Sequence, residues 1–175
     1  RRQRQMCIRD SPIIFSEYCQ KIYMKISIAL TSFNGERFLQ EQLDSFKNQS
    51  IQPDELIVCD DCSEDKTISI LQKFKDSASF DTQIYQNETN VGLTRNFEKA
   101  ISLCSGDIIF LSDQDDVWFN EKIEIILNVF KDNESIDAVM NDAYYSDELL
   151  QKSPTTVLEK PAYYTGSDEE HLAGA

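Results

Sequence analysis

Two aspartates that directly follow an apolar stretch are the first residues of this sequence that could do chemistry. Asp113 and Asp115 come after the run 108–111, which has the length of a β-strand. Side chains two apart in an extended chain project to the same side, so the two carboxylates would lie close together and would need a cation between them. Mg²⁺ or Mn²⁺ held by one or two carboxylates keeps open positions that phosphate oxygens fill. The spacing therefore favours a divalent metal site over a solvated turn or a helix cap.

Three further polar segments also follow apolar, strand-like stretches. They are residues 31–35 after the stretch 26–30, Asp60 and Asp61 after the stretch 56–59, and residues 87–92 after the stretch 83–85. Strand and helix patterns alternate from Met24 onward, which predicts an α/β fold with a doubly wound, mainly parallel sheet. Ligands of such sheets bind outside the carboxyl ends of the strands, so all four polar segments should border one crevice.

Helices are expected between these strands, because apolar residues recur there at helical spacing. The residues that mark them are Leu39, Leu43 and Phe46; Ile68, Leu71 and Phe74; Leu93, Phe97, Ala100, Ile101 and Cys104; and Ile123, Ile126, Val129 and Phe130. Ser63 is the expected N-cap of the second helix, and Gly106 is the expected glycine cap after the third. The run 108–111 has no polar alternation, which predicts a central strand covered on both faces, and residues 138–140 predict a further strand.

The overall charge limits which partners are expected. The sequence carries a formal net charge of −14, so its field repels nucleic acids and anionic lipid surfaces. A small anionic ligand would need a local device, and a divalent cation that reverses the local sign is such a device. Apolar runs stay far below the roughly 20 residues of a membrane-spanning helix, so we expect no transmembrane segment.

The cysteines favour reduced thiols in the cytoplasm. There are five, an odd number, and they are scattered rather than arranged as a disulfide framework. Cys59 and Cys62 form a CxxC pair, a spacing that also occurs in redox and zinc elements. A zinc site needs two further ligands, and the one histidine, His171, is isolated near the end of the sequence. We therefore expect this pair to carry neither metal nor redox chemistry.

Four segments, taken together, resemble glycosyltransferase family 2. They are Thr31–Glu36, Cys59–Asp65, Asn90–Asn96 and Ser112–Trp118. They occur in the order of the family, and the resemblance spans about residues 24 to 140, which makes the combination much more specific than any one of the segments. The form Ser-Asp-Gln-Asp-Asp-x-Trp is most similar to bacterial rhamnosyltransferase-like members.

The resemblance implies a GT-A fold, a Rossmann-like domain that binds a nucleotide sugar, and inverting transfer. The implied donor is a dTDP- or UDP-sugar, with Mg²⁺ or Mn²⁺ as cofactor. The implied acceptor is a saccharide or a lipid-linked saccharide in cell-surface polysaccharide synthesis. The implied location is the cytoplasm, with the inner face of the membrane as an alternative.

The family's site residues are carried over onto the matching positions. The resemblance implies that Thr31 and Phe33 surround the base and that Asp61 accepts a hydrogen bond from a pyrimidine. It implies that Arg95 faces the ribose and the diphosphate. Asp113 and Asp115 match the Asp-x-Asp element, and Asp115 is the expected direct metal ligand. Two departures stand out: Phe33 replaces the usual tyrosine, and Cys62 stands where a glycine, which readily takes a positive φ, is common.

The same resemblance predicts the domain limits. Residues 24–145 are the expected nucleotide-sugar-binding domain, and residues 146–175 the beginning of an incomplete acceptor-side region. We expect residues 1–23, a basic tail before a natural start at Met24, to be non-native or disordered. The general base is expected beyond residue 175, so we expect weak donor binding and little or no transfer.

Several residues have a simpler structural interpretation. Asp60 could cap a helix or bond nearby amides, Arg95 could merely pair with Glu98, and Trp118 is either core or a platform for the sugar.

Other functions make different demands on the sequence. Nucleotidyltransferases place a glycine-rich, basic loop after the first strand, whereas residues 31–37 contain one glycine and one arginine. Neither GxGxxG nor GxxxxGK[ST] occurs, which disfavours dehydrogenases and phosphate-loop ATPases. A phosphoacceptor receiver domain would need an acidic pair where residues 32–34 read Ser-Phe-Asn. A module that binds the nucleotide sugar without activity stays open.

Overall fold

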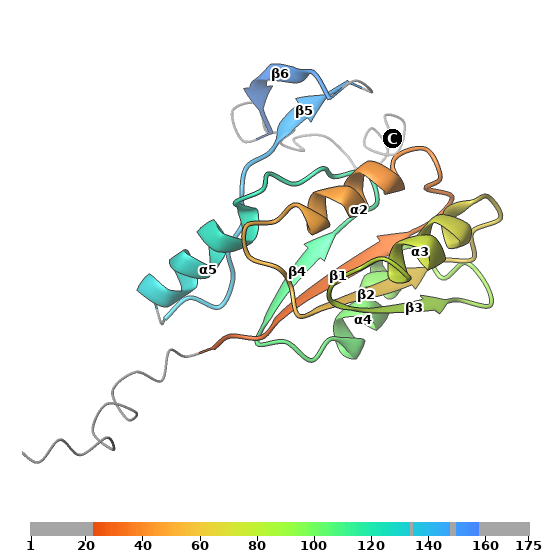
Figure 1. The fold of residues 1–175 in the computed structure, drawn as a ribbon, viewed down its shortest axis with the longest axis horizontal. Helices are drawn as coiled ribbons and strands as arrows, with labels where there is room; N and C mark the ends of the chain where they lie inside the picture. The colour runs from red at the N-terminus through yellow and green to blue at the C-terminus, as the bar shows by residue number, and fades with distance from the viewer. Residues whose placement is uncertain (1–22, 134, 148–149, 158–175) are drawn as a thin grey trace, which may run out of the picture. The chain divides into compact units, whose positions relative to one another are not determined.

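The computed structural model describes residues 23–133, 135–147 and 150–157 (Figure 1). Its contacts group the chain into two compact units, the first ending at Leu127 and the second beginning at Asn128. Helix α5 (Lys122–Asp132) contains this boundary. The domain limits expected from the sequence, 24–145 and 146–175, therefore stay predictions.

A four-stranded parallel sheet forms the centre of the first unit (Figure 1). The strands lie in the order β3 (Asp81–Gln86), β2 (Glu55–Asp60), β1 (Ile26–Ser32) and β4 (Ile108–Ser112). Every residue of β1 and β2 is buried, which is expected of inner strands that helices cover on both faces. The mainly parallel sheet with flanking helices confirms the predicted α/β class.

Three helices connect the strands as right-handed crossovers require. Helices α2 (Leu39–Lys47) and α3 (Thr67–Lys75) contact one another on one face of the sheet, whereas α4 (Leu93–Leu103) packs on β1 and β2 from the other face (Figure 1). The change of face follows from the strand order, because the chain moves outward from β1 to β3 and then returns past β1 to β4. The three residues that predicted the first helix are all fully buried; they are Leu39, Leu43 and Phe46.

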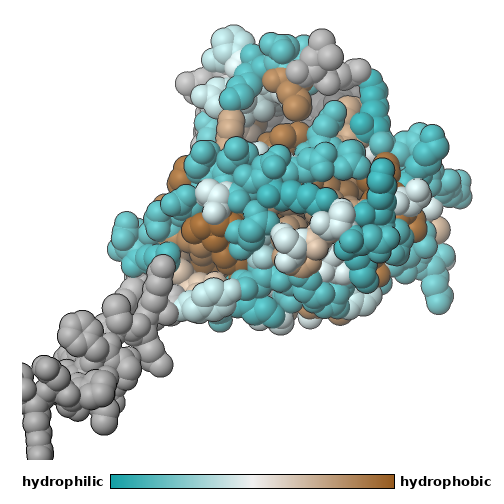
Figure 2. Space-filling model, viewed as in Figure 1, coloured by the Kyte–Doolittle hydropathy of each residue, from teal (hydrophilic) through white to brown (hydrophobic). Residues whose placement is uncertain are grey.

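The second unit contains an antiparallel pair, β5 (Tyr144–Ser146) and β6 (Lys152–Thr156). Within the three described ranges, no helix reaches the length and hydropathy that a bilayer span requires. The face shown in Figure 2 is covered mostly by hydrophilic residues, and hydrophobic residues gather there in separated patches.

Two strand predictions were wrong. Residues 138–140 are irregular, and the chain becomes extended only at Tyr144, where β6 supplies a pairing partner. The run 108–111 does form β4, but β4 lies at an edge of the described sheet and Leu111 is 54% exposed. An apolar run indicates a strand, but the position of that strand depends on which neighbours pair with it.

Predictions about helix ends and faces also needed correction. Helix α3 begins at Thr67 rather than after Ser63, whose Oγ instead donates to Asp60. Helix α4 turns Asn96 and Ala100 inward, while Leu93 is 58% exposed. Gly106 is not at a positive φ; a Cβ there would lie 2.4 Å from Ser27 Oγ, so this glycine is needed for close approach.

Candidate functional site

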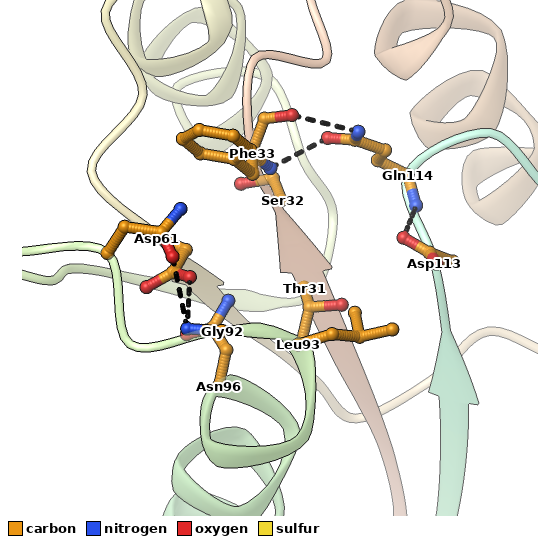
Figure 3. A pocket seen from close by; sticks show the side chains of 10 residues that line it. Thr31, Ser32, Phe33, Asp61, Gly92, Leu93, Asn96, Asp113 and Gln114 are labelled. Carbon is orange, nitrogen blue, oxygen red and sulfur yellow. Dashed lines mark hydrogen bonds between the residues drawn. The ribbon is translucent and has the colours of Figure 1, made fainter. Parts of the chain in front are cut away.

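A pocket of about 280 Å³ opens at the carboxyl ends of β1, β2 and β4 (Figure 3). Doubly wound sheets bind their ligands where the strand order changes direction. In this sheet that point lies between β1 and β4, because β2 and β3 lie on one side of β1 and β4 lies on the other. The pocket is lined by Thr31, Ser32, Phe33, Asp61, Asn90, Gly92, Leu93, Asn96, Asp113 and Gln114. Four of the six predicted site residues are among them, namely Thr31, Phe33, Asp61 and Asp113.

Thr31 lines this pocket and carries a buried hydroxyl that has no partner in the described chain. The residue is 1% exposed, and its Oγ1 has no hydrogen-bond partner in the part of the chain that the structure describes. A buried hydroxyl without a partner is unfavourable, so a ligand that supplies one would bind there with advantage. Phe33, two residues further on, is 45% exposed and presents a large apolar ring to the same pocket.

Asp61 is tied to the loop that precedes α4. Its Oδ1 accepts hydrogen bonds from Val91 N and Asn87 Nδ2, both at 2.8 Å, and its Oδ2 accepts one from Gly92 N at 2.9 Å. Burial alone would raise the pKa of this carboxyl, but the hydrogen bonds and the nearby Lys99 ammonium lower it overall. Asp61 therefore carries a negative charge on one wall of the pocket, opposite Asp113 in the view of Figure 3.

Asp60 has a local structural role. It is fully buried, and its carboxylate accepts hydrogen bonds from Ser32 Oγ at 2.9 Å and from Ser63 N at 2.8 Å, as well as from the Ser63 hydroxyl. This corresponds to the simpler of the two interpretations, in which Asp60 binds nearby groups rather than a ligand.

The β1–α2 loop and the β2–α3 loop are joined directly to each other. Asn34 N donates to Ser63 Oγ at 2.8 Å, while Glu64 N donates to Asn34 Oδ1 at 2.9 Å. Gly35 N donates to Thr67 Oγ1 at 2.8 Å. These reciprocal bonds fix the two pocket walls that carry Phe33 and Asp61 before any ligand arrives.

Cys59 and Cys62, the CxxC pair, lie in different environments. Cys59 lies buried in β2, and burial raises the pKa of its thiol, which disfavours the reactive thiolate. The Cys62 thiol contacts Glu88 O at 3.8 Å. Cys62 also takes a φ of 68°, so the turn reaches a positive φ although the usual glycine is absent.

The carboxylate loop, residues 113–116, brings acidic groups together. Asp113 is half-buried and lines the pocket, and Gln114 N donates to its Oδ1 at 2.8 Å. Burial raises the pKa of Asp113; the hydrogen bond from Gln114 N opposes this rise, and the charge of Asp115 adds to it. Burial and the charges of Asp115 and Asp113 likewise raise the pKa of Asp116, against the effect of Lys122. Clustered carboxylate oxygens with unfavourable mutual charge fit a hard divalent cation.

Two predicted site residues do not line the pocket. The side chain of Asp115 is exposed, and so is that of Arg95 on α4. In the described chain, no ion pair joins Arg95 to Glu98, and no three His, Cys, Asp or Glu side chains form a group that could hold a metal ion. The ligand roles of Asp115 and Arg95 stay predictions.

Trp118 belongs to the core. It is 5% exposed, and its ring centroid lies 4.7 Å from that of Phe46 and 5.8 Å from that of Phe110. The Lys122 ammonium lies 4.0 Å from the centroid of the Trp118 ring. Burial lowers the pKa of Lys122 to about 8, an effect that the charge of Asp116 opposes. Trp118 does not line the pocket, so the platform interpretation has no support.

Two asparagines that sequence analysis did not assign complete the Asp61 wall. Asn87 Nδ2 donates to Asn96 Oδ1 at 3.0 Å as well as to Asp61, and Lys99 Nζ donates to Asn87 Oδ1 at 2.7 Å. Asn96 Nδ2 donates to Cys59 O at 2.7 Å, so β2, α4 and the loop between β3 and α4 share one network. The available indication was Asn96, a polar residue within the amphipathic helix α4. The helix was predicted from the spacing of its apolar residues, and that pattern gives no role to a buried asparagine.

A family model described as glycosyl transferase family 2 matches residues 27–172. The chain belongs to this family. The resemblance seen in the sequence is therefore confirmed at the level of family 2. The match does not support the nucleotidyltransferase, dehydrogenase and ATPase alternatives. The structure of TarS residues 1–349 from Staphylococcus aureus in complex with UDP is similar, with a TM-score of 0.58 and 27% identity over 63% of this chain and 33% of that chain. This agreement supports the GT-A fold.

The curated relatives that this chain matches include glycosyltransferases that are longer than it is. It is 35% identical over 100 residues to the putative glycosyltransferase EpsE of Bacillus subtilis, covering 57% of this chain and 36% of the relative. It is 32% identical over 140 residues to an uncharacterized glycosyltransferase of Haemophilus influenzae, covering 80% of this chain and 56% of the relative. The chain thus spans between a third and somewhat over half of these relatives.

Proposed function

We propose that this chain binds the nucleoside-diphosphate sugar of an inverting glycosyltransferase. The single observation that carries the proposal is the pocket at the carboxyl edge of the sheet, which gathers Thr31, Phe33, Asp61 and Asp113 from three separate segments. In this arrangement the donor's base lies near Phe33 and Thr31, and its diphosphate points toward the carboxylate loop.

The base end suits a pyrimidine. The Phe33 ring gives an apolar face for stacking, the Thr31 hydroxyl needs a partner, and Asp61 has a charged acceptor on the adjacent wall. Similarity to TarS structures that contain UDP and UDP-GlcNAc supports a uridine diphosphate donor. A dTDP-sugar, and rhamnose as the sugar, rest on the Ser112–Trp118 motif alone.

The diphosphate end would hold Mg²⁺ or Mn²⁺ between Asp113 and Asp115, with Asp115 as the direct ligand. When bound, the cation supplies Lewis-acid stabilisation of the departing diphosphate. Asp113 and Asp115 orient it, and Arg95 adds positive charge on the ribose and diphosphate side. The acceptor would be a saccharide or a lipid-linked saccharide, reached from the cytoplasm or the inner face of the membrane.

Titration calorimetry with UDP, dTDP and GDP, each with and without Mn²⁺, tests this proposal. We expect a pyrimidine diphosphate to bind only when Mn²⁺ is present. We expect Asp115→Ala to lose this Mn²⁺-dependent binding. The matched control is Asp76→Ala, which removes a carboxylate at the C-terminal end of α3. Equal indifference of the chain to all three nucleotides would contradict the proposal. Binding without any transfer to saccharide acceptors would favour a nucleotide-sugar-binding module instead.

A further inference from the structure

Gln114, the middle residue of the Asp-x-Asp element, is hydrogen-bonded to the base side of the pocket. Its Oε1 accepts a hydrogen bond from Phe33 N at 2.8 Å, and its Nε2 donates one to Phe33 O at 3.0 Å (Figure 3). A side-chain amide that uses both its donor and its acceptor on one residue's backbone imitates the pairing of a neighbouring strand. The two loops joined in this way come from positions 81 residues apart.

Gly35 provides the space for this contact. A Cβ at Gly35 would lie 2.2 Å from Gln114 Oε1 and 2.8 Å from Gln114 Cδ, and the three nearest atoms all belong to the Gln114 side chain. The backbone of Gly35 is not at a positive φ, so conformational freedom does not explain a glycine here. A side chain at position 35 would therefore displace the Gln114 amide from its contact with Phe33.

The carboxylate loop is anchored on both flanks, because Gln42 Nε2 donates to Ser112 Oγ at 2.7 Å and Trp118 N donates to Ser45 Oγ at 3.1 Å. Between these anchors the side chains of Asp115 and Val117 are exposed, so packing contributes little order there. The carboxylates on either side of Gln114 are like charges only two residues apart, and such charges repel each other unless a cation joins them. The hydrogen bonds between Gln114 and the backbone of Phe33 would therefore set the positions of the carboxylates.

We propose that Gln114 is a positioning residue that sets the separation between the base end and the metal end of the pocket. This inference rests on the proposed function, in which the base lies near Phe33 and the cation lies near Asp113 and Asp115. Gln114 holds the carboxylate loop to the segment that carries Phe33, so a nucleoside diphosphate can reach both ends at once. Without the hydrogen bonds between Gln114 and Phe33, the base end and the metal end of the pocket still form, but the distance between them is no longer fixed.

A double-mutant cycle without ligand tests the contact itself. Gln114→Ala should lower the midpoint of thermal unfolding by about 4 °C, because two hydrogen bonds are lost. Gly35→Ala should lower it by a similar amount in the wild-type background but change it little in the Gln114→Ala background. Additive effects of the two substitutions would overturn the assignment, because Gly35 would then be needed for a reason other than Gln114.

Calorimetry with uridine and with UDP plus Mn²⁺ tests the positioning role. Gln114→Met keeps the length of the side chain but removes the amide, and it should weaken binding of UDP with Mn²⁺ about tenfold. Uridine, which has no phosphate to reach the carboxylate loop, should bind the variant and the wild type equally well. The matched control is Gln40→Met on the exposed side of α2, where the amide donates to Asp44, and it should leave both affinities unchanged.

The outcomes separate this inference from the proposed function. Equal losses of uridine and UDP affinity in Gln114→Met would mean that Gln114 merely supports the base side, and unchanged UDP affinity would remove its role altogether. Either result overturns the positioning role while the proposed function survives. Failure of the wild-type chain to bind any nucleotide would instead overturn the proposed function and, with it, the positioning role. The ligand-free cycle would still report whether the contact exists.

Discussion

Replacing Thr31 by valine should stabilise the ligand-free protein and, at the same time, weaken nucleotide binding. Thr31 lies in β1, is 1% exposed, and presents an Oγ1 without a partner in the described part of the chain. Valine has nearly the same shape but lacks the hydroxyl. Thr31→Val therefore removes an unsatisfied polar group from the folded protein and removes a binding group from the pocket.

The expected magnitudes follow from this environment. A buried hydroxyl without a partner costs about 1–3 kcal/mol. Taking the lower end of this range, we expect the free energy of unfolding to rise by about 1 kcal/mol. The midpoint of thermal unfolding should rise by about 2–4 °C. Loss of one hydrogen bond in the complex should weaken the binding of UDP with Mn²⁺ about tenfold.

Thermal unfolding and titration calorimetry measure the two effects, and Thr67→Val is the matched control. Thr67 is also buried, but its Oγ1 accepts a hydrogen bond from Gly35 N at 2.8 Å. The same substitution there should lower the free energy of unfolding by about 1 kcal/mol, because the amide loses its partner. If Thr31→Val lowers stability as Thr67→Val does, then the Thr31 hydroxyl is already paired and the reasoning about the pocket fails.

Further predictions concern the stability of the protein. Hydrogen bonds from Ser27 and other groups outweigh burial and lower the pKa of Glu55 from 4.5 to about 2, so its contribution to stability is present above pH 4.5 and is lost as the pH falls toward 2. Glu55→Gln should be about 3 kcal/mol less stable than the wild type at pH 7, and chemical denaturation should show this difference shrinking below pH 4.5; a difference independent of pH would contradict the assignment. Gly92 has a φ of 86° and a ψ of 157°, a region that is essentially restricted to glycine, so Gly92→Ala should cost about 2 kcal/mol from backbone strain although the space around its Cβ position is free. Gly106→Ala should cost more, because its Cβ would lie 2.4 Å from Ser27 Oγ. Thermal unfolding compares the two variants, and a smaller loss of stability in Gly106→Ala than in Gly92→Ala would contradict this prediction.

Local sequence patterns predicted the framework well. Apolar runs flanked by polar residues indicated the four parallel strands, and residues such as Leu39 and Leu43 indicated the helix between the first two. The place of β4 could not be predicted in the same way, because a run of apolar residues says nothing about which strands pair with it. Leu93, which was expected on the buried face of α4, is exposed because the pocket lies at the start of that helix, whereas Asn96, which had no assigned role, is buried in a polar network.

The site was predictable to the extent that strand ends determine it. Thr31, Phe33, Asp61 and Asp113 come together because they end or follow adjacent parallel strands, and strand order alone brings them to one edge. The contact of Gln114 with Phe33 is different in kind. It depends on a side chain that reaches across to another loop, and the sequence held no periodic pattern that could indicate it.

The reciprocal hydrogen bonds between the β1–α2 and β2–α3 loops bear on how fast a nucleotide can associate. Because Asn34 and Thr67 already join these loops, no slow conformational step has to precede docking of the base. Association should then be limited by diffusion against the field of an acidic surface. Its rate should therefore rise, rather than fall, as added salt screens the repulsion between the protein and an anionic nucleotide.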